Sequence, residues 1–229
     1  MTKYDLFKNA EFENLKNILV RTFQSCNLNI LLGSGASLPA INTLGNIEND
    51  IDQLLKDNKE KEAIKKSYNF LKNIYEQNTI FNTDDENIII TTKNYYNFVN
   101  LLYRILKNRK NYKTEPHVNI YTTNYDLFLE YTLETSNYLI NYNDGFVNKN
   151  NLFRAPNINI VDFNKKVSYK TELYDYISYI PNFNIIKLHG GLNWRVRKNS
   201  EIIFENPLKI LDDLKNVENL PVKKIKCFR

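Results

Sequence analysis

Asn29-Ile30-Leu31-Leu32-Gly33-Ser34-Gly35-Ala36-Ser37 is an apolar run that leads directly into a Gly-Ser-Gly turn. Glycines let a backbone bend tightly and place no Cβ between it and a ligand. Backbone amides at such a turn, ahead of a helix, can hold a diphosphate. The pattern therefore predicts a strand over residues 28–32 that ends in a phosphate-binding loop, although an ordinary turn has the same composition. Pro39 indicates that any helix after the turn is short or begins later.

Two further apolar strands are predicted downstream, at residues 118–122 and 184–188, and each ends in a polar motif. Asn124 follows the first of these strands, and His189 follows the second. The carboxyl ends of parallel strands meet at one edge of a sheet, where α/β proteins bind their ligands. The three strand ends together predict a nucleotide-binding crevice.

Helical spacing of apolar residues dominates the rest of the chain. It predicts helices at residues 8–25, 45–75 (with a break at 57–59), 94–109, 127–135 and 207–217. Residues 88–90 fit either a strand or the start of a helix, and the first helix is expected to pack on the sheet. The alternation of strands and helices predicts an α/β fold with a mostly parallel sheet, and an inserted helical segment at about 45–110.

Shorter elements complete the predicted order. A third strand is expected at 138–140 and an edge strand at 202–204. Residues 147–180 are predicted to be irregular, with loop, short strands and a short helix near 173–179.

Composition restricts the class of protein. The chain has 229 residues, a net charge of +5 and two cysteines, Cys26 and Cys227, which cannot form a structural zinc site. No apolar run approaches the length of a membrane span, about 18 residues, and residues 1–5 lack the apolar region of a signal peptide, so we expect a cytoplasmic protein. The basic residues form no clear nucleic-acid site. The GxSxG, HExxH and GxxxxGK[ST] motifs are missing from the sequence.

The polar residues at the strand ends have chemistry that suits a nucleotide site. The carboxamide of Asn124 can donate and accept at once, which suits a ribose hydroxyl or an attacking water; a turn or helix cap is the alternative. Asp126 can bond a sugar or favour the helix dipole. His189 beside Gly190 and Gly191 is a candidate general base, or else a structural histidine.

Other polar and aromatic residues have two readings each. Ser34 and Ser37 can bond phosphate or ribose hydroxyls, or cap the next helix. Asp144 can face the same crevice or form an ordinary turn, and Trp194 is read as a core anchor rather than a stacking platform.

Three motifs resemble, in order, the signatures of the sirtuins. They are Gly33-Ser34-Gly35-Ala36-Ser37, Thr123-Asn124-Tyr125-Asp126 and Leu188-His189-Gly190-Gly191. The forms are most similar to the divergent sirtuin-like domains of bacterial anti-phage defence systems. The resemblance implies a Rossmann-like fold that binds NAD and cleaves its nicotinamide–ribose bond.

The resemblance also implies roles for individual residues. Asn124, His189 and Asp126 would be catalytic. NAD would be the substrate, without a metal, and would be held by matched positions: Gly33, Ser34, Gly35, Ala36, Ser37, Thr123 and Gly190. Asp144, which lies outside the three motifs, is a further candidate for binding NAD.

Departures from the sirtuins refine the expectation. Cys26 and Cys227 cannot supply the four-cysteine zinc module that frames the acyl-lysine groove of deacylases, which favours NAD hydrolysis over deacylation. The arginine and phenylalanine that follow Gly-Ile-Pro in deacylases are missing, and Ala40, Ile41 and Asn42 follow Pro39 instead. A late Gly-Ser/Thr strand end for the adenosine half is also missing.

We therefore expect a NAD hydrolase that acts in anti-phage defence by NAD depletion. The alternatives are a NAD-dependent protein deacylase and a non-catalytic NAD or ADP-ribose sensor module. The resemblance implies a homo-oligomer, or a partner such as a HerA-type ATPase or a fused or separate phage sensor. Residues 1–229 are expected to form a single sirtuin-like domain, either complete or a fragment of a longer protein.

Overall fold

The computed structural model describes most of the chain. Its described residues are 10–41, 45–80, 84–109, 116–147, 157–158, 163, 165, 167–170, 177–196, 201–206 and 209. The helices are α1 (Ala10–Ser25), the 3₁₀ helix η2 (Ser34–Ser37), α2 (Gly45–Lys56), α3 (Glu60–Ile80), α4 (Glu86–Lys107) and α5 (Phe128–Thr135).

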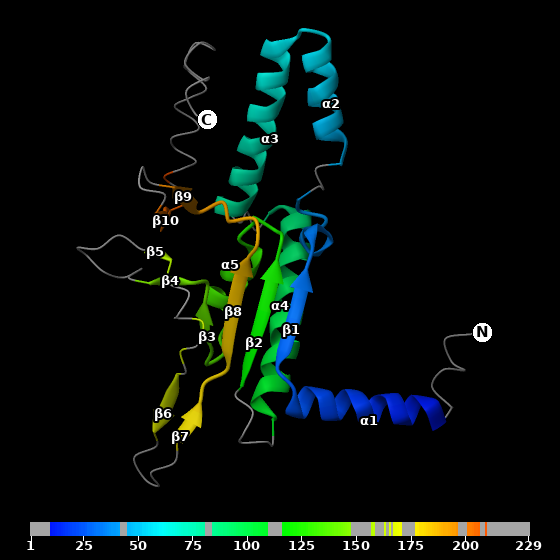
Figure 1. Cartoon of the computed structure of the whole chain (residues 1–229), viewed down its shortest axis with the longest axis vertical. Helices are drawn as coiled ribbons and strands as arrows, with labels where there is room; N and C mark the ends of the chain where they lie inside the picture. Colours follow the sequence, from blue (N-terminus) through cyan, green and yellow to red (C-terminus); the bar gives the residue numbers. More distant parts are fainter. Residues whose placement is uncertain are drawn as a thin grey trace.

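Four parallel strands form the central sheet (Figure 1). Their spatial order is β1 (Leu28–Leu32), β2 (His117–Thr122), β8 (Asn182–Lys187) and β3 (Asn141–Asn143). The strands predicted around residues 28, 118 and 184 are confirmed, and so is the α/β class with a parallel main sheet. The topology is compatible with a Rossmann-like fold.

The third predicted strand lies three residues later than expected, at β3 rather than at 138–140. Pairing with β8 fixes its position, because Asn141 lies opposite Asn182. The aromatic residue of the predicted strand has another use: the ring of Tyr138 stacks on Tyr103 of α4 at 4.4 Å. The apolar residues at 138–140 fitted a strand, but the structure shows that they belong to the connection before β3, where Tyr138 packs on α4.

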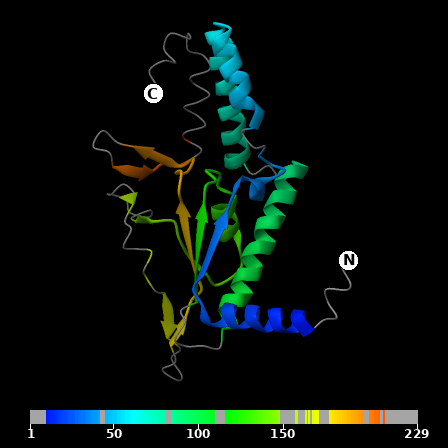
Figure 2. The same cartoon turned by 45° about the vertical axis from the view of Figure 1, so that its right-hand side comes forward.

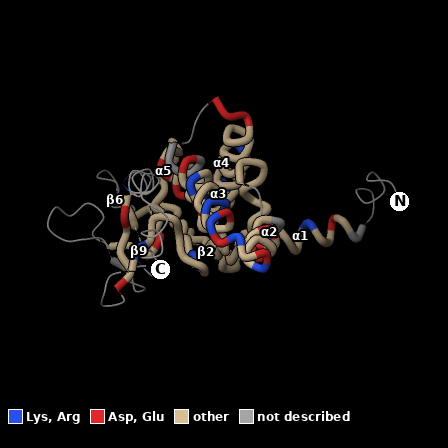
Figure 3. The backbone as a smooth tube through the Cα atoms, turned by 90° about the horizontal axis from the view of Figure 1, so that it is seen from above, with Lys and Arg blue, Asp and Glu red and all other residues tan. Residues whose placement is uncertain are grey.

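One face of the sheet packs against α4 and α5 (Figure 3). Val118 and Ile120 of β2 and Phe183 of β8 are completely buried there, together with Val99 of α4 and Phe128 of α5. The alternation of buried and partly exposed residues along β2 is the pattern of a strand with one apolar face. This cluster is the main core of the protein.

Asparagines form a hydrogen-bonded row across the other face of the sheet. The amide of Asn119 donates to Asn29 at 2.9 Å, and that of Asn184 donates to Asn119 at 2.8 Å. Asn182 donates to Asn184 at 2.9 Å, and Asn141 donates to Asn182 at 2.6 Å. The row satisfies amide groups that would otherwise be costly to bury beside the sheet.

After η2, the described part of the chain has three α-helices between β1 and β2 in sequence: α2, α3 and α4. The carboxylate of Asp85 accepts hydrogen bonds from the amides of Asn87 and Ile88, so it caps α4. Residues 88–90 are therefore helical rather than extended. Asn58, at φ 58°, forms the break between α2 and α3 in the left-handed region that asparagine tolerates, as predicted for residues 57–59.

Helices α2 and α3 pack on each other and extend past the carboxyl edge of the sheet (Figures 1 and 2). Residues of both charges occur along them (Figure 3). The interpretation of this segment as an insertion stays a prediction.

Helix α1 does not pack on the sheet, so that expectation is wrong (Figure 1). Arg109, just past the end of α4, donates to the carbonyl oxygens of Phe23 at 3.0 Å and Cys26 at 2.8 Å. These bonds fix the carboxyl end of α1 beside α4, which already covers the sheet face. The apolar stripe of α1 is 38–53% exposed at Leu15, Ile18, Leu19, Val20 and Phe23.

The remaining strands are antiparallel. A second sheet has the order β4 (Phe146–Val147), β5 (Asn157–Ile158), β10 (Ile202–Phe204) and β9 (Trp194–Val196), and β6 (Ser168–Lys170) pairs with β7 (Ile177–Tyr179). The edge strand at 202–204 is confirmed, and so are short strands within 147–180, at β5, β6 and β7. The pairing of strands into a second sheet was not predicted.

The helix expected near 173–179 is wrong for residues 177–179, which pair with β6 instead. The rest of that prediction lies outside the described residues, as does the helix at 207–217 apart from Lys209. Among the described helices, none has the length and apolar character that crossing a membrane requires.

The difference in burial between α1 and α4 predicts a difference in stability. Leu102 of α4 is 4% exposed, whereas Leu19 of α1 is 45% exposed. We expect Leu102→Ala to lower the free energy of unfolding by about 2–5 kcal/mol, because it leaves a cavity in the core. The same change at Leu19 should cost less than about 1 kcal/mol. Urea unfolding of both variants measures this, and equal losses would show that the apolar stripe of α1 is covered in solution.

Candidate functional site

The three polar motifs meet at one edge of the central sheet. Leu32 lies opposite Thr122, and Thr122 lies opposite Lys187, so the three strands end at the same level. The amide of Thr123 donates to the carbonyl of Leu32 at 3.3 Å, and the amide of Leu188 donates to that of Thr122 at 2.8 Å. The expected convergence of the strand ends is confirmed.

The glycine turn presents an open surface at this edge. Gly33 has an extended backbone, and the chain then forms the single turn η2, which confirms the short helix indicated by Pro39. A Cβ at Gly33 or Gly35 would meet no atom within 4 Å. Packing does not require glycine at either position, so the space beside the backbone is available to a ligand. Ala36 instead packs against the core.

A buried polar cluster lies directly behind the turn, with the hydroxyl of Ser37 at its centre. This hydroxyl donates to the carboxylate of Asp126 at 2.5 Å, and it lies 3.0 Å from the hydroxyl of Tyr95. The amide nitrogen of Asn124 donates to the Ser37 hydroxyl and to the carbonyl of Gly33, both at 3.0 Å. All four side chains are at most 7% exposed.

The proton positions in this cluster follow from the donors present. Because the Ser37 hydroxyl gives its proton to Asp126, it can only accept from Asn124 and Tyr95. Burial and the charge of Asp126 raise the pKa of Tyr95 far above its ordinary value, so its phenol keeps the proton that it donates. The network therefore fixes which way the Asn124 amide faces.

The oxygen of the Asn124 amide takes no part in these hydrogen bonds. It is buried and has no hydrogen-bond partner among the described residues. A buried acceptor without a partner costs free energy, so this atom is suited to accept from a bound hydroxyl or water. The nitrogen of the same amide donates to the carbonyl of Gly33, so the Asn124 amide lies beside the glycine turn.

Asp126 lies at the start of α5, as its reading as a residue that favours the helix N-terminus requires, and it also belongs to the buried cluster. One carboxylate oxygen accepts from Ser37, and the other accepts from the amide of Phe128 at 3.2 Å, at the start of α5. The carboxylate therefore orients the cluster and satisfies an amide at the helix start.

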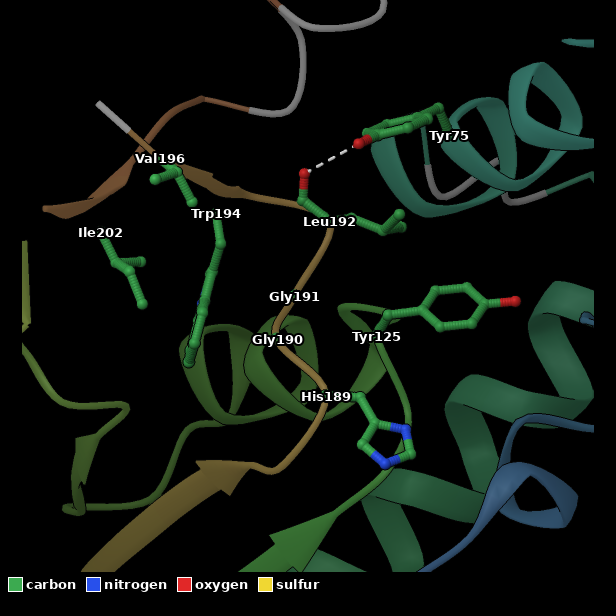
Figure 4. A pocket seen from close by; sticks show the side chains of 9 residues that line it. All are labelled: Tyr75, Tyr125, His189, Gly190, Gly191, Leu192, Trp194, Val196 and Ile202. Carbon is green, nitrogen blue, oxygen red and sulfur yellow. Dashed lines mark hydrogen bonds between the residues drawn. The ribbon is translucent and has the colours of Figure 1, made fainter. Parts of the chain in front are cut away.

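His189 is exposed and lines a cleft of about 430 Å³ at the same edge (Figure 4). The cleft is bounded largely by aromatic and apolar residues: Tyr75, Tyr125, Leu192, Trp194, Val196 and Ile202. Figure 4 shows the imidazole on the same side of the backbone as Tyr125, and the Trp194 ring on the other side. An exposed ring at the mouth of a cleft is free to exchange protons with a bound molecule.

The glycines after His189 serve the packing of the chain. Gly190 has φ +83°, and a Cβ at Gly191 would lie 2.7 Å from the amide oxygen of Asn193. Trp194 packs edge-on against Phe146 at 5.4 Å, in agreement with its reading as an anchor, although it also lines the cleft.

The remaining predicted residues have local roles. Ser34 is exposed on η2, and the amide of Thr123 ties β2 to β1. Asp144 is buried and accepts from the amide of Phe146 at 3.2 Å, the turn that the sequence offered as its alternative. Asn143 lies opposite Asn184, which comes before the end of β8 at Lys187. Asp144 is therefore farther from the carboxyl edge of the sheet than the ends of β1, β2 and β8 are.

Two residues of the site were missed by sequence reasoning. Tyr95 lies on the buried face of α4 with Thr91 and Val99, so helical periodicity could have placed it in the core but not beside Ser37. Lys187 is a charged residue in the apolar strand β8, and it forms a buried ion pair with Glu130 at 2.8 Å. A lysine inside an apolar strand was the available signal.

Comparison with protein-family models finds no match for this chain, and comparison with curated proteins finds none either.

The two glycine turns predict different responses to an added methyl group. Gly190→Ala should lower the free energy of unfolding by about 1–2 kcal/mol, because alanine is strained at positive φ. Gly33→Ala should change it by less than about 1 kcal/mol in either direction, because its conformation is ordinary and its Cβ would meet open space. Urea unfolding compares the two variants. A large loss for Gly33→Ala would mean that the turn is packed rather than open.

Proposed function

We propose that this protein hydrolyses NAD at the bond between nicotinamide and ribose. The observation that supports it most is the unpartnered, buried amide oxygen of Asn124 beside the open glycine turn. Such an acceptor suits a ribose hydroxyl or the attacking water. The order of the three motifs, which resembles that of the sirtuins, supports the same substrate.

Binding would use the sheet edge. Backbone amides of the turn at Gly33 and Gly35 would hold the diphosphate, with Ser34 available to a phosphate or ribose oxygen. Asn124 would accept from the nicotinamide ribose or orient the water. Ser37, Tyr95 and Asp126 would hold the Asn124 amide in that orientation, which removes the cost of ordering it during the reaction.

The chemical step would displace nicotinamide by water. The bond from the ribose carbon to the pyridinium nitrogen breaks, and its electron pair leaves with neutral nicotinamide. The water oxygen bonds to the same carbon, and His189 accepts the proton that the water loses. The fixed dipole of the Asn124 amide would stabilise the cationic sugar in the transition state. The products are nicotinamide and ADP-ribose.

We propose further that this activity depletes NAD in the cytoplasm of phage-infected bacteria. Such an activity is toxic, so it would be controlled by self-association or by a second protein, either an ATPase of the HerA type or a phage sensor. The motif resemblance is the support for this part of the proposal.

The direct test is nicotinamide release from NAD by the purified protein. Asn124→Ala and His189→Ala should each lower kcat/KM at least about 100-fold, because they remove the oriented acceptor and the general base. His117→Ala is the matched control, because His117 lies at the opposite end of β2, and its rate should be unchanged.

The outcomes separate the candidate activities. NAD binding without turnover by the wild-type protein would favour a sensor module or an enzyme that awaits its partner. Release of O-acyl-ADP-ribose from an acylated peptide would identify a deacylase. A protein that neither binds NAD nor turns it over would contradict the proposal.

Binding gives a second test at the glycine turn. Gly33→Ala should weaken NAD binding at least about tenfold, because a methyl group would stand between the backbone amides and the diphosphate. Isothermal titration with NAD measures the affinity, and the unfolding experiment on the same variant controls for stability. An unchanged affinity would mean that the diphosphate does not lie on this turn.

A further inference from the structure

A buried ion pair lies beneath the candidate site. Lys187, the last residue of β8, and Glu130, in α5, lie 2.8 Å apart, with side chains 3% and 9% exposed. Burying two charges is costly, and a pair of this kind seldom stabilises a fold more than apolar residues of the same size. The pair therefore calls for an explanation other than stability.

The Lys187 ammonium reaches beyond Glu130 to the backbone of the neighbouring turn. It donates to the carbonyl of Asp126 and lies 3.5 Å from the carbonyl of Tyr125. An ammonium group has three donors, and these three acceptors account for them. The turn that bears Asn124 and Asp126 is thus tied directly to β8.

The same side chain also supports the chain that follows β8. His189 lies two residues after Lys187, and a Cβ at Gly191 would be 3.1 Å from the Lys187 side chain. The lysine stem therefore packs under the glycine turn beside His189, while its head holds the turn after β2. One residue contacts both parts of the site.

We propose that Lys187 and Glu130 are positioning residues that hold the Asn124–Asp126 turn and the His189 turn in fixed relation. The catalytic consequence rests on the proposed NAD hydrolysis, whereas the ordering of the turn does not. Glu130 neutralises the ammonium, because an isolated buried charge would be costly there.

Chemistry explains why this position needs a charged donor. The carbonyls of Tyr125 and Asp126 lie past the end of the β2 ladder. The carbonyl of Tyr125 accepts from the amide of Leu192 at 2.9 Å, whereas that of Asp126 accepts from the Lys187 ammonium. A methionine would fill the same space but could not donate. Burial raises the pKa of Glu130 while the Lys187 charge opposes that rise, and the second oxygen of Glu130 has no partner among the described residues.

The test removes both charges together, in the variant Lys187→Met/Glu130→Met. Apolar replacement of a complete pair should keep the melting temperature within about 5 °C of the wild type. Hydrogen exchange in a peptide that covers residues 123–127 should be at least about tenfold faster, because the Asp126 carbonyl no longer accepts a hydrogen bond from Lys187. For nicotinamide release, kcat should fall at least about tenfold, with the KM for NAD within about threefold of the wild type.

Two matched variants control the experiment. Lys16→Met/Glu13→Met removes an exposed pair on α1, whose side chains are 57% and 64% exposed, and should change neither exchange at residues 123–127 nor turnover. Lys187→Met alone should melt below the double variant, because it leaves Glu130 buried without its partner.

The outcomes are separable. Unchanged exchange at residues 123–127 in the double variant would overturn the proposal, whatever the activity of the protein. Faster exchange with unchanged kcat would overturn the catalytic part. If the wild-type protein releases no nicotinamide, the proposed function fails while exchange still decides the positioning role.

Discussion

The parallel pairing of β1, β2 and β8 is the constraint on which the rest of the structure depends. Its register makes three strands end at one level, although more than 80 residues separate the first strand from the second. Everything proposed about function requires that alignment. A shift by one residue would turn the apolar side chains of β2 away from α4 and α5, so burial of Val118 and Ile120 holds the register.

The site combines a rigid interior with an open edge. Ser37, Tyr95 and Asp126 lie inside the protein and satisfy one another, while the glycine turn and His189 face outward. The Asn124 amide joins the two regions, because its nitrogen belongs to the buried cluster and its oxygen lacks a described partner. Such an arrangement orients a functional group before a ligand arrives.

The cleft beside His189 depends on elements outside the central sheet. Tyr75 comes from α3, and its hydroxyl donates to the carbonyl of Leu192 at 3.1 Å, which joins the helical segment to the chain after β8 (Figure 4). Val196 and Ile202 come from the antiparallel sheet. Residues from a helix and from the antiparallel sheet therefore line the cleft together with the chain that follows β8.

The main strands, most helices and the polar motifs could be predicted from the amino-acid sequence, because apolar periodicity and turn residues act locally. The break near Asn58 and the short helix before Pro39 were predictable for the same reason. The direction of α1, the position of β3 and the antiparallel sheet each depend on contacts between distant residues, so they could not be predicted before the tertiary structure was known. Likewise, Asn124 and His189 could be found as strand-end residues, whereas Tyr95 and Lys187 could not be assigned to the site. Their roles arise from the Ser37 hydroxyl and the Asp126 carbonyl, which come into reach only when the helices and strands pack together.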